Sequence, residues 1–225
     1  MKKLIALIFI IILGVIVGTK IINTEEKYTR EEIIALFEKG EKCNNYSCEY
    51  NDSYNKIIIK VKENKMVVIR EDMQSIKPKF VQYIDFSADK STMLGEEGNL
   101  KIAIVTPLNP TSVGIGVPDK LYYKDIIEMI KDYDGYKFEY IKEEKINDIE
   151  CVKIKMTSSY ENEIWIDILS GFVVRSRAIF KNSEYNSQID YNFKLNHVTE
   201  DDVKVPDLTD YSVSEYNWWN YANIM

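Results

Sequence analysis

The first hydrophobic feature of the chain is an unbroken apolar run from Leu4 to Gly18, which follows Lys2 and Lys3. A positive start before such a run is typical of a secretion or anchoring signal. The run lacks an alanine cleavage motif, and no cysteine follows it to accept a lipid, although a cleaved signal stays the alternative. We therefore predict that residues 4–22 cross the membrane as an uncleaved N-terminal signal anchor, with the C-terminal domain outside the cytoplasm.

Beyond this segment, helical periodicity predicts two helices. Thr29 and Glu32 have the spacing of a capping box, and Gly40 is expected to end the first helix. The apolar positions of this helix form one stripe, made of Ile33, Ile34, Leu36 and Phe37. The second helix is expected over Leu121–Tyr133, with an apolar side made of Ile126, Ile127, Met129 and Ile130.

Alternating apolar and polar positions predict strands in most of the remaining chain. Residues 57–62 and 66–69 flank Glu63-Asn64-Lys65 and are typical of a hairpin. Further strands are expected at Phe80–Phe86, at Leu100–Val105 and from Phe138 onward, and the Pro- and Gly-rich residues 106–119 interrupt the pattern.

The hairpin from Glu163 to Lys181 gives the most specific prediction. A three-residue loop, Leu169–Gly171, would pair Ile168 with Phe172 and Ile166 with Val174, so that apolar side chains share one face. A one-residue shift in register would move every side chain of a strand to the other face. The three-residue loop is therefore favoured.

The same register makes a prediction for the other face of the hairpin. It places Trp165 opposite Arg175 as a cation–π surface pair, and Glu163 opposite Arg177 as an ion pair. A two-residue turn at Ser170-Gly171 would instead put Arg175 beside the isoleucines, which is costly.

The most informative feature of the composition is the net charge. The 225 residues carry a formal charge of −7, and the three lysines within residues 1–22 make the remainder more acidic still. An acidic surface repels nucleic acid and offers no polybasic membrane patch. Sixteen tyrosines and only nine glycines suit a strand-rich fold.

The three cysteines allow one disulfide in an exported chain. Cys43 and Cys48 are a possible disulfide if the chain turns at Asn44-Asn45. Cys151 lies on an alternating strand and is interpreted as a small buried residue. A redox role for the Cys43–Cys48 pair is disfavoured because the two-residue spacing of redox motifs is missing. An intermolecular disulfide is a minor alternative.

No set of residues predicts catalysis, a metal site or a cofactor. His197 is the only histidine and has no serine or cysteine neighbour in sequence, so a surface or capping role is favoured. The segment Asp132–Gly135 lacks the ligand series of a calcium loop. Residues 200–202 could bind a cation weakly, but a solvated turn is the preferred interpretation. We therefore predict that the chain is not an enzyme.

The C-terminal segment concentrates aromatic area, in Tyr216, Trp218, Trp219 and Tyr221. Two interpretations have equal weight. The segment packs against the domain as a final strand or tail, or it forms an interface for a partner or a membrane surface.

Several of these features together resemble the LolA-like superfamily of lipoprotein carriers and related envelope proteins. The resemblance runs from about Thr29 to Tyr211, and its best motifs are Trp165-Ile166-Asp167, Gly171 and Val205-Pro206. It implies an α+β fold, with a strongly curved antiparallel β half-barrel and helices packed on its concave face. In size and overall texture the chain also resembles clostridial proteins related to the germination lipoprotein GerS.

These observations define one expected organisation. An N-terminal signal anchor (residues 1–22) and a short linker (23–28) precede a single LolA-like extracytoplasmic domain (29–225). The expected function is non-enzymatic docking on, or activation of, an envelope or spore-cortex protein, as the family resemblance implies. The alternative is a carrier whose apolar concave face binds a lipid acyl chain or a lipoprotein. A permanent anchor favours docking, because a carrier has to diffuse between membranes.

Overall fold

The computed structural model of the 225-residue chain describes seven segments: residues 28–73, 79–97, 99–108, 120–132, 137–158, 160–180 and 186–215. The predicted signal anchor and the aromatic residues Tyr216, Trp218, Trp219 and Tyr221 lie outside these segments, so both remain predictions. No helix among the described residues is long and apolar enough to span a bilayer.

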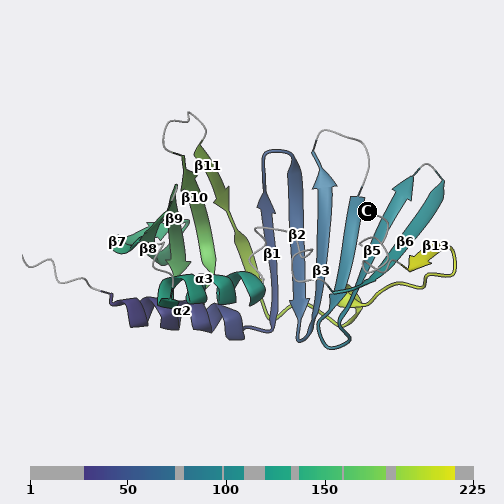
Figure 1. Cartoon of the computed structure of the whole chain (residues 1–225), viewed down its shortest axis with the longest axis horizontal. Helices are drawn as coiled ribbons and strands as arrows, with labels where there is room; N and C mark the ends of the chain where they lie inside the picture. Colours follow the sequence, from purple (N-terminus) through teal and green to yellow (C-terminus); the bar gives the residue numbers. More distant parts are fainter. Residues whose placement is uncertain are drawn as a thin grey trace, which may run out of the picture.

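The described strands form two open sheets, and two helices accompany them (Figure 1). Helix α2 spans Arg30–Lys42 and helix α3 spans Lys120–Asp132. In spatial order the large sheet contains β12 (Asn192–Leu195), β1 (Asn45–Asn51), β2 (Asn55–Lys62), β3 (Lys65–Asp72), β4 (Lys79–Asp85), β5 (Lys90–Glu97), β6 (Leu100–Pro107) and β13 (Ser212–Glu215). The small sheet contains β11 (Asn186–Asp190), β10 (Val173–Ile179), β9 (Glu161–Asp167), β8 (Ile149–Thr157) and β7 (Lys137–Ile146).

Helix α2 begins with the predicted capping box. The Glu32 carboxylate accepts from the Thr29 amide at 2.8 Å, and the Thr29 hydroxyl accepts from the Glu32 amide at 3.2 Å. The helix continues past Gly40 to Lys42, so the prediction that Gly40 ends it is wrong. Gly40 allows close packing instead, because a Cβ there would lie 2.8 Å from the carbonyl oxygen of Gly171.

The main core lies between the two helices and one face of each sheet, which we call the inner face. Helix α2 packs against α3, and apolar residues of both helices join the inner faces of β1–β3 and β8–β9 in one cluster. Its largest fully buried side chains are the rings of Phe37, Tyr46, Tyr123 and Phe172. These rings fill the space between the helices and the sheets.

A single residue joins the two sheets. Strand β11 ends at Asp190 in the small sheet, and β12 begins at Asn192 in the large sheet. Between them, the amide of Tyr191 donates to the carbonyl of Val174 at 2.9 Å. The result is a mostly β fold with two helices and two sheets that stay open, consistent with the curved half-barrel that the family resemblance implies.

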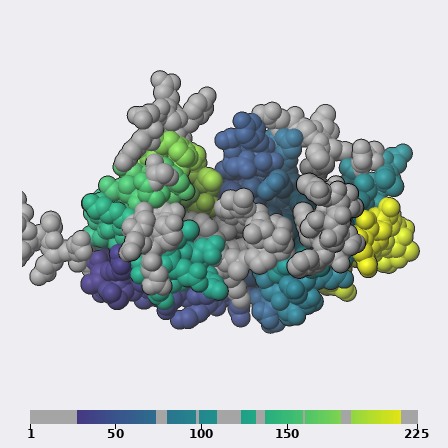
Figure 2. Space-filling model, in the orientation of Figure 1, coloured from purple at the N-terminus to yellow at the C-terminus, as the bar shows by residue number. Residues whose placement is uncertain are grey.

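The outer face of the large sheet is crossed by a segment that we call the strap, residues 196–211 (Figure 1, yellow). Val198 and Val203 of the strap pack on Val67, and the Lys60 ammonium pairs with the Asp202 carboxylate. After the strap, β13 pairs in parallel with β6 and forms an edge of the large sheet. The space-filling view shows β13 (yellow) at the end of the molecule far from α2 (purple; Figure 2).

The tip of the β9–β10 hairpin differs from the prediction. The loop has four residues, 168–171, and Asp167 and Phe172 close it with a backbone hydrogen bond of 2.8 Å. Ile166 pairs with Val173, so the predicted Ile166–Val174 pairing and the three-residue loop are wrong. A β-bulge after Val173 absorbs the extra residue.

The cause of this difference lies in the loop itself. The Asp167 carboxylate accepts from the amides of Leu169 at 2.9 Å and Ser170 at 3.3 Å, and Gly171 has a φ of +76°. An aspartate that caps such a turn and a glycine with positive φ stabilise the longer loop. Below the bulge the predicted register returns, with Trp165 opposite Arg175.

Candidate functional site

A cavity of about 440 Å³ lies at the seam between the two sheets, and we call it the seam cavity. It is bounded by the β12 edge of the large sheet, the β7–β8 turn and the β9–β10 loop. Its wall is aromatic, with Phe172, Tyr191 and Phe193, and its rim carries the aliphatic residues Ile149 and Leu195. Five polar residues also line it, Asn147, Asp167, Ser170, Asp190 and Asn192, and a cavity that combines apolar and polar groups is the usual form of a binding site.

The aromatic wall is held in place by stacking. The ring of Phe172 is parallel to that of Phe193, at 4.3 Å between centroids and an angle of 9°. Tyr46 packs on Phe172 from the core side at 4.8 Å. Because Phe172 also belongs to the main core, the wall is continuous with that core.

Tyr191 adds a polar group to this wall. Its hydroxyl lies 3.1 Å from the hydroxyl of Ser176, and burial raises the pKa of Tyr191 to about 12. The phenol therefore stays neutral at physiological pH and offers a hydrogen bond rather than a charge.

The rim of the cavity exposes apolar surface. Ile149 is 36% exposed and Leu195 is 45% exposed, and Leu169 on the adjoining loop is 87% exposed. Asn147 and Asp148 form the preceding turn, and both have positive φ. Exposed aliphatic groups around an aromatic wall are the arrangement expected where a partner's apolar side chain binds.

Sequence reasoning did not find the aromatic residues of β12. Tyr191, Phe193 and Leu195 alternate along the chain, which was the available signal. The signal was not recognised because the strand is short and polar residues flank its aromatic positions.

The predicted surface pair is present, but it is packed into the sheet. Trp165 is only 5% exposed, between the Lys153 ammonium at 4.5 Å and the Arg175 guanidinium carbon at 5.9 Å from its ring centroid. Its indole N–H donates to the Glu144 carboxylate. Arg175 also binds Asp190, a residue of the seam cavity, so the pair supports one side of that cavity.

The predicted ion pair on the same face is part of a larger set of charges. The Arg177 guanidinium lies 3.8 Å from the Glu163 carboxylate, and the Lys153 ammonium lies 2.6 Å from it. Lys153 thereby links Glu163 to Trp165.

The predicted disulfide is not formed, because Cys43 and Cys48 are both free thiols. Cys43 caps the C-terminus of α2, and Cys48 faces the core from β1. The chain extends at Asn45 instead of turning, and three residues of strand already span about 10 Å, beyond the Cα–Cα range of a disulfide. Burial raises the pKa of Cys48, and it raises that of Cys151 to about 11, so both thiols stay protonated.

The remaining chemical candidates have structural roles. The His197 ring lies 3.1 Å from the Ser47 hydroxyl on the exposed outer face. Asp202 binds Lys60 and the Thr199 amide, which lowers its pKa. Within the described segments, no group of three or more His, Cys, Asp or Glu side chains could hold a metal ion.

Comparisons with known proteins identify the fold. No protein-family model matches the chain, and no curated protein matches it. Among solved structures, the chain is similar to an uncharacterized conserved protein from Thermus thermophilus, with a TM-score of 0.50 and 12% identity over 83% of this chain and 98% of that chain. It is also similar to the Pseudomonas aeruginosa MucA/MucB complex, with a TM-score of 0.48 and 10% identity over 79% of this chain and 61% of that chain.

A LolA superfamily protein, NE2245 from Nitrosomonas europaea, is also among these structures. Its TM-score is 0.28, with 10% identity over 76% of this chain and 96% of that chain. The chain spans about three fifths of the MucB chains that it matches. At these identities the matches show the fold alone.

Proposed function

We propose that this chain is a non-enzymatic extracytoplasmic binding protein that docks on a protein partner through the seam cavity. The observation that carries this proposal is an aromatic-walled cavity whose aliphatic rim is open to solvent. The predicted signal anchor would hold the domain beside a partner at the membrane surface. The family resemblance suggests an envelope or spore-cortex protein as that partner.

The chemistry of the cavity favours a protein partner. Aromatic and aliphatic groups can enclose one or two apolar side chains, and Asp190 and Asn192 at the margin can bind the partner's polar groups. Protein interfaces have this composition, with an apolar centre and a polar rim. A carrier would need a longer apolar space for acyl chains, but the rings of Phe37, Tyr123 and Phe172 occupy the space beneath the helices.

Site-specific crosslinking tests the proposal. A photo-crosslinking residue at Leu195 in the full chain, expressed in its own envelope, should give one dominant protein adduct. Ile149→Asp on the opposite rim should abolish that adduct. A crosslinker at Tyr54, an exposed aromatic outside the cavity, is the matched control. Equal adducts from both positions would contradict docking at the seam.

The C-terminal aromatics are proposed as a separate contact for the partner, because they follow β13, at the edge of the large sheet opposite the seam cavity. Replacing Trp218 and Trp219 by alanine should weaken partner crosslinking while the domain stays folded. Loss of the folded circular-dichroism signal would instead show that these residues complete the core.

A lipid or lipoprotein carrier is the second candidate, because one observation favours it. On the inner face of β4–β6, Phe80, Met93, Ile102 and Ile104 are only half-buried, and a Cβ added at Gly95 would meet no atom of the described residues within 4 Å. Native mass spectrometry of the full chain distinguishes the two candidates. A co-purifying lipid would support the carrier, and a stoichiometric protein would support docking.

A further inference from the structure

A second cavity, of about 380 Å³, lies on the outer face of the large sheet, beneath the strap. We call it the strap cavity. Its apolar wall comes from the strap, with Val203, Val205 and Leu208. The sheet side contributes Tyr83 and Thr92. It shares no lining residue with the seam cavity.

Three lysines line this cavity together with one acid, Asp85. Lys65 is already paired with Glu200 of the strap at 3.2 Å. Lys90 and Lys204 form no ion pair with any residue in the described part of the chain. Two unpaired ammonium groups beside one apolar cavity are unusual in a chain with a net charge of −7.

Asp85 does not neutralise these lysines by direct contact. Its carboxylate accepts from the amides of Ser87 at 2.9 Å and Ala88 at 3.0 Å, and also from the Ser87 hydroxyl. These hydrogen bonds lower the pKa of Asp85 and commit it to the β4–β5 turn. The ammonium groups of Lys90 and Lys204 remain available to an anion.

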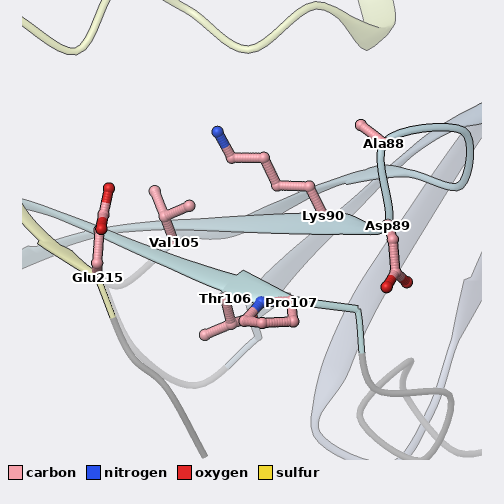
Figure 3. Close-up of a pocket in the computed structure, with 7 residues that line it drawn as sticks. All are labelled: Ala88, Asp89, Lys90, Val105, Thr106, Pro107 and Glu215. Carbon is pink, nitrogen blue, oxygen red and sulfur yellow. The ribbon is translucent and has the colours of Figure 1, made fainter.

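Lys90 also lines a neighbouring cavity of about 430 Å³ at the edge of the sheet (Figure 3). In that view its side chain extends to the same side as Val105 and Glu215, and Asp89 points the opposite way. Ala88 and Lys90 belong to both cavities, so the two lie next to each other. The Lys90 ammonium is therefore reachable from the open side of the sheet.

We propose that the strap cavity binds a small amphipathic anion, a carboxylate or phosphate attached to a short apolar body. The anionic group lies between Lys90 and Lys204, where charge-assisted hydrogen bonds stabilise it. The apolar body packs against Val203, Val205 and Leu208. A volume of about 380 Å³ lies within the usual range for small-molecule sites and limits the ligand to a short chain. This site is independent of the seam cavity and of the proposed docking function.

Lysine footprinting of the full chain in nanodiscs tests the proposal. Acetylation of individual lysines is followed by mass spectrometry with octanoate, octyl phosphate, octylammonium or inorganic phosphate. Octanoate or octyl phosphate at ten times its Kd should slow acetylation of Lys90 and Lys204 about tenfold. Lys137, an exposed lysine of β7, is the internal control and should be unaffected.

Substitution of the two lysines provides a second test of the proposed site. Lys90→Gln and Lys204→Gln should each weaken octanoate binding about tenfold or more in calorimetry, because each removes a charge-assisted hydrogen bond. Lys137→Gln should leave the Kd unchanged, and so should Ile149→Asp in the seam cavity. Both lysines of the site are on the surface, so circular dichroism should show intact folds.

The four compounds separate the possible outcomes. Protection by octanoate, by octyl phosphate or by both supports the proposal and identifies the preferred anionic group. Equal protection by octylammonium would overturn it, because the site would then be merely apolar. Full protection by inorganic phosphate alone would overturn the role of the apolar body. Absence of protection by all four would overturn the site itself.

Discussion

The two halves of the large sheet differ in what packs on their inner faces. In the helix-covered half, β1–β3 turn apolar side chains inward to α2 and α3, and these side chains form the main core. In the other half, which we call the strap-covered half because the strap cavity lies on it, β4–β6 bury Leu94 and Ala103 on the outer face, and of the residues described there only Ile84 of β4 joins the main core from the inner face. On the inner face of this half, Gln82 instead donates to Ser91 at 2.9 Å.

The difference separates stability from binding. The helix-covered half is stabilised by large buried rings, which leave little freedom to rearrange. Among the described residues, the strap-covered half buries no aromatic ring, and cavities lie beside it. We infer that the first half holds the seam cavity rigid, and that the second can bind small ligands without disturbing the core.

The largest predicted effect comes from emptying the helix-covered core. Phe37→Ala should lower the free energy of unfolding by about 3–5 kcal/mol, because it leaves a cavity among buried rings. Met93→Ala, on the inner face of the strap-covered half, should cost less than about 2 kcal/mol, because Met93 is only half-buried. Urea unfolding at pH 7 measures both. Equal losses would contradict the comparison.

A second prediction compares a glycine packed against helix α2 with a glycine of the strap-covered half. At Gly171 an added Cβ would overlap the carbonyl oxygen of Leu36, and φ is +76°. Gly171→Ala should therefore destabilise the protein by about 2 kcal/mol or more. Gly95→Ala should stabilise it by about 0.5 kcal/mol, because open space surrounds that position and alanine restricts the unfolded chain. Thermal unfolding of the two variants should therefore shift in opposite directions.

The strap predicts a dependence on pH. The Lys60 ammonium and the Thr199 groups lower the pKa of Asp202 well below its usual range. A lowered folded-state pKa adds stability above the unfolded pKa of about 4, and this stability is lost as the pH falls further toward the folded value. Asp202→Asn should cost about 1 kcal/mol at pH 7.

Wild type and Asp202→Asn together test the direction of this pH dependence. The stability difference between wild type and Asp202→Asn should shrink steadily between about pH 4 and pH 2 in urea unfolding experiments. A difference that stays constant over this range would show that the ion pair does not hold the strap.

The smallest effect is expected on the outer face of the small sheet. Arg175→Lys keeps the positive charge but loses the bidentate hydrogen bonds to Asp190 and the cation–π contact of the guanidinium with Trp165. We expect a loss of about 0.5–1 kcal/mol. Arg177→Lys is the control and should have less effect, because its guanidinium contacts Glu163 only at 3.8 Å. A larger loss of stability from Arg177→Lys than from Arg175→Lys would contradict the greater role assigned to Arg175.

Local signals in the sequence predicted local structure well. The capping box depends on two residues three positions apart, Thr29 and Glu32, and it forms as expected. The pairing of Trp165 with Arg175 also follows from nearby residues. The bulge that restores this register was missed, because it depends on how Asp167 and Gly171 shape the loop.

The sites depend on distant residues and could not be read from local patterns. The wall of the seam cavity joins Phe172 of one sheet to Phe193 of the other. The lysines of the strap cavity, Lys90 and Lys204, come from a strand and from the strap. Two strands, β1 and β5, were not predicted. Strand β1 carries its alternation on Tyr46, Cys48 and Tyr50 rather than on Ile or Val, and polar residues interrupt the apolar pattern of β5.

The order of the strands has a consequence for folding during synthesis. Strand β1 lies near the N-terminus of the domain, but one of its two neighbours in the sheet, β12, is made of residues 192–195. The contact between Asn45 and Val198 joins residues 153 positions apart. Until the last part of the chain emerges, one edge of β1 has no partner strand and is open to aggregation. We therefore expect slow folding that completes only after residues 192–198 have been made, and protection by chaperones until then.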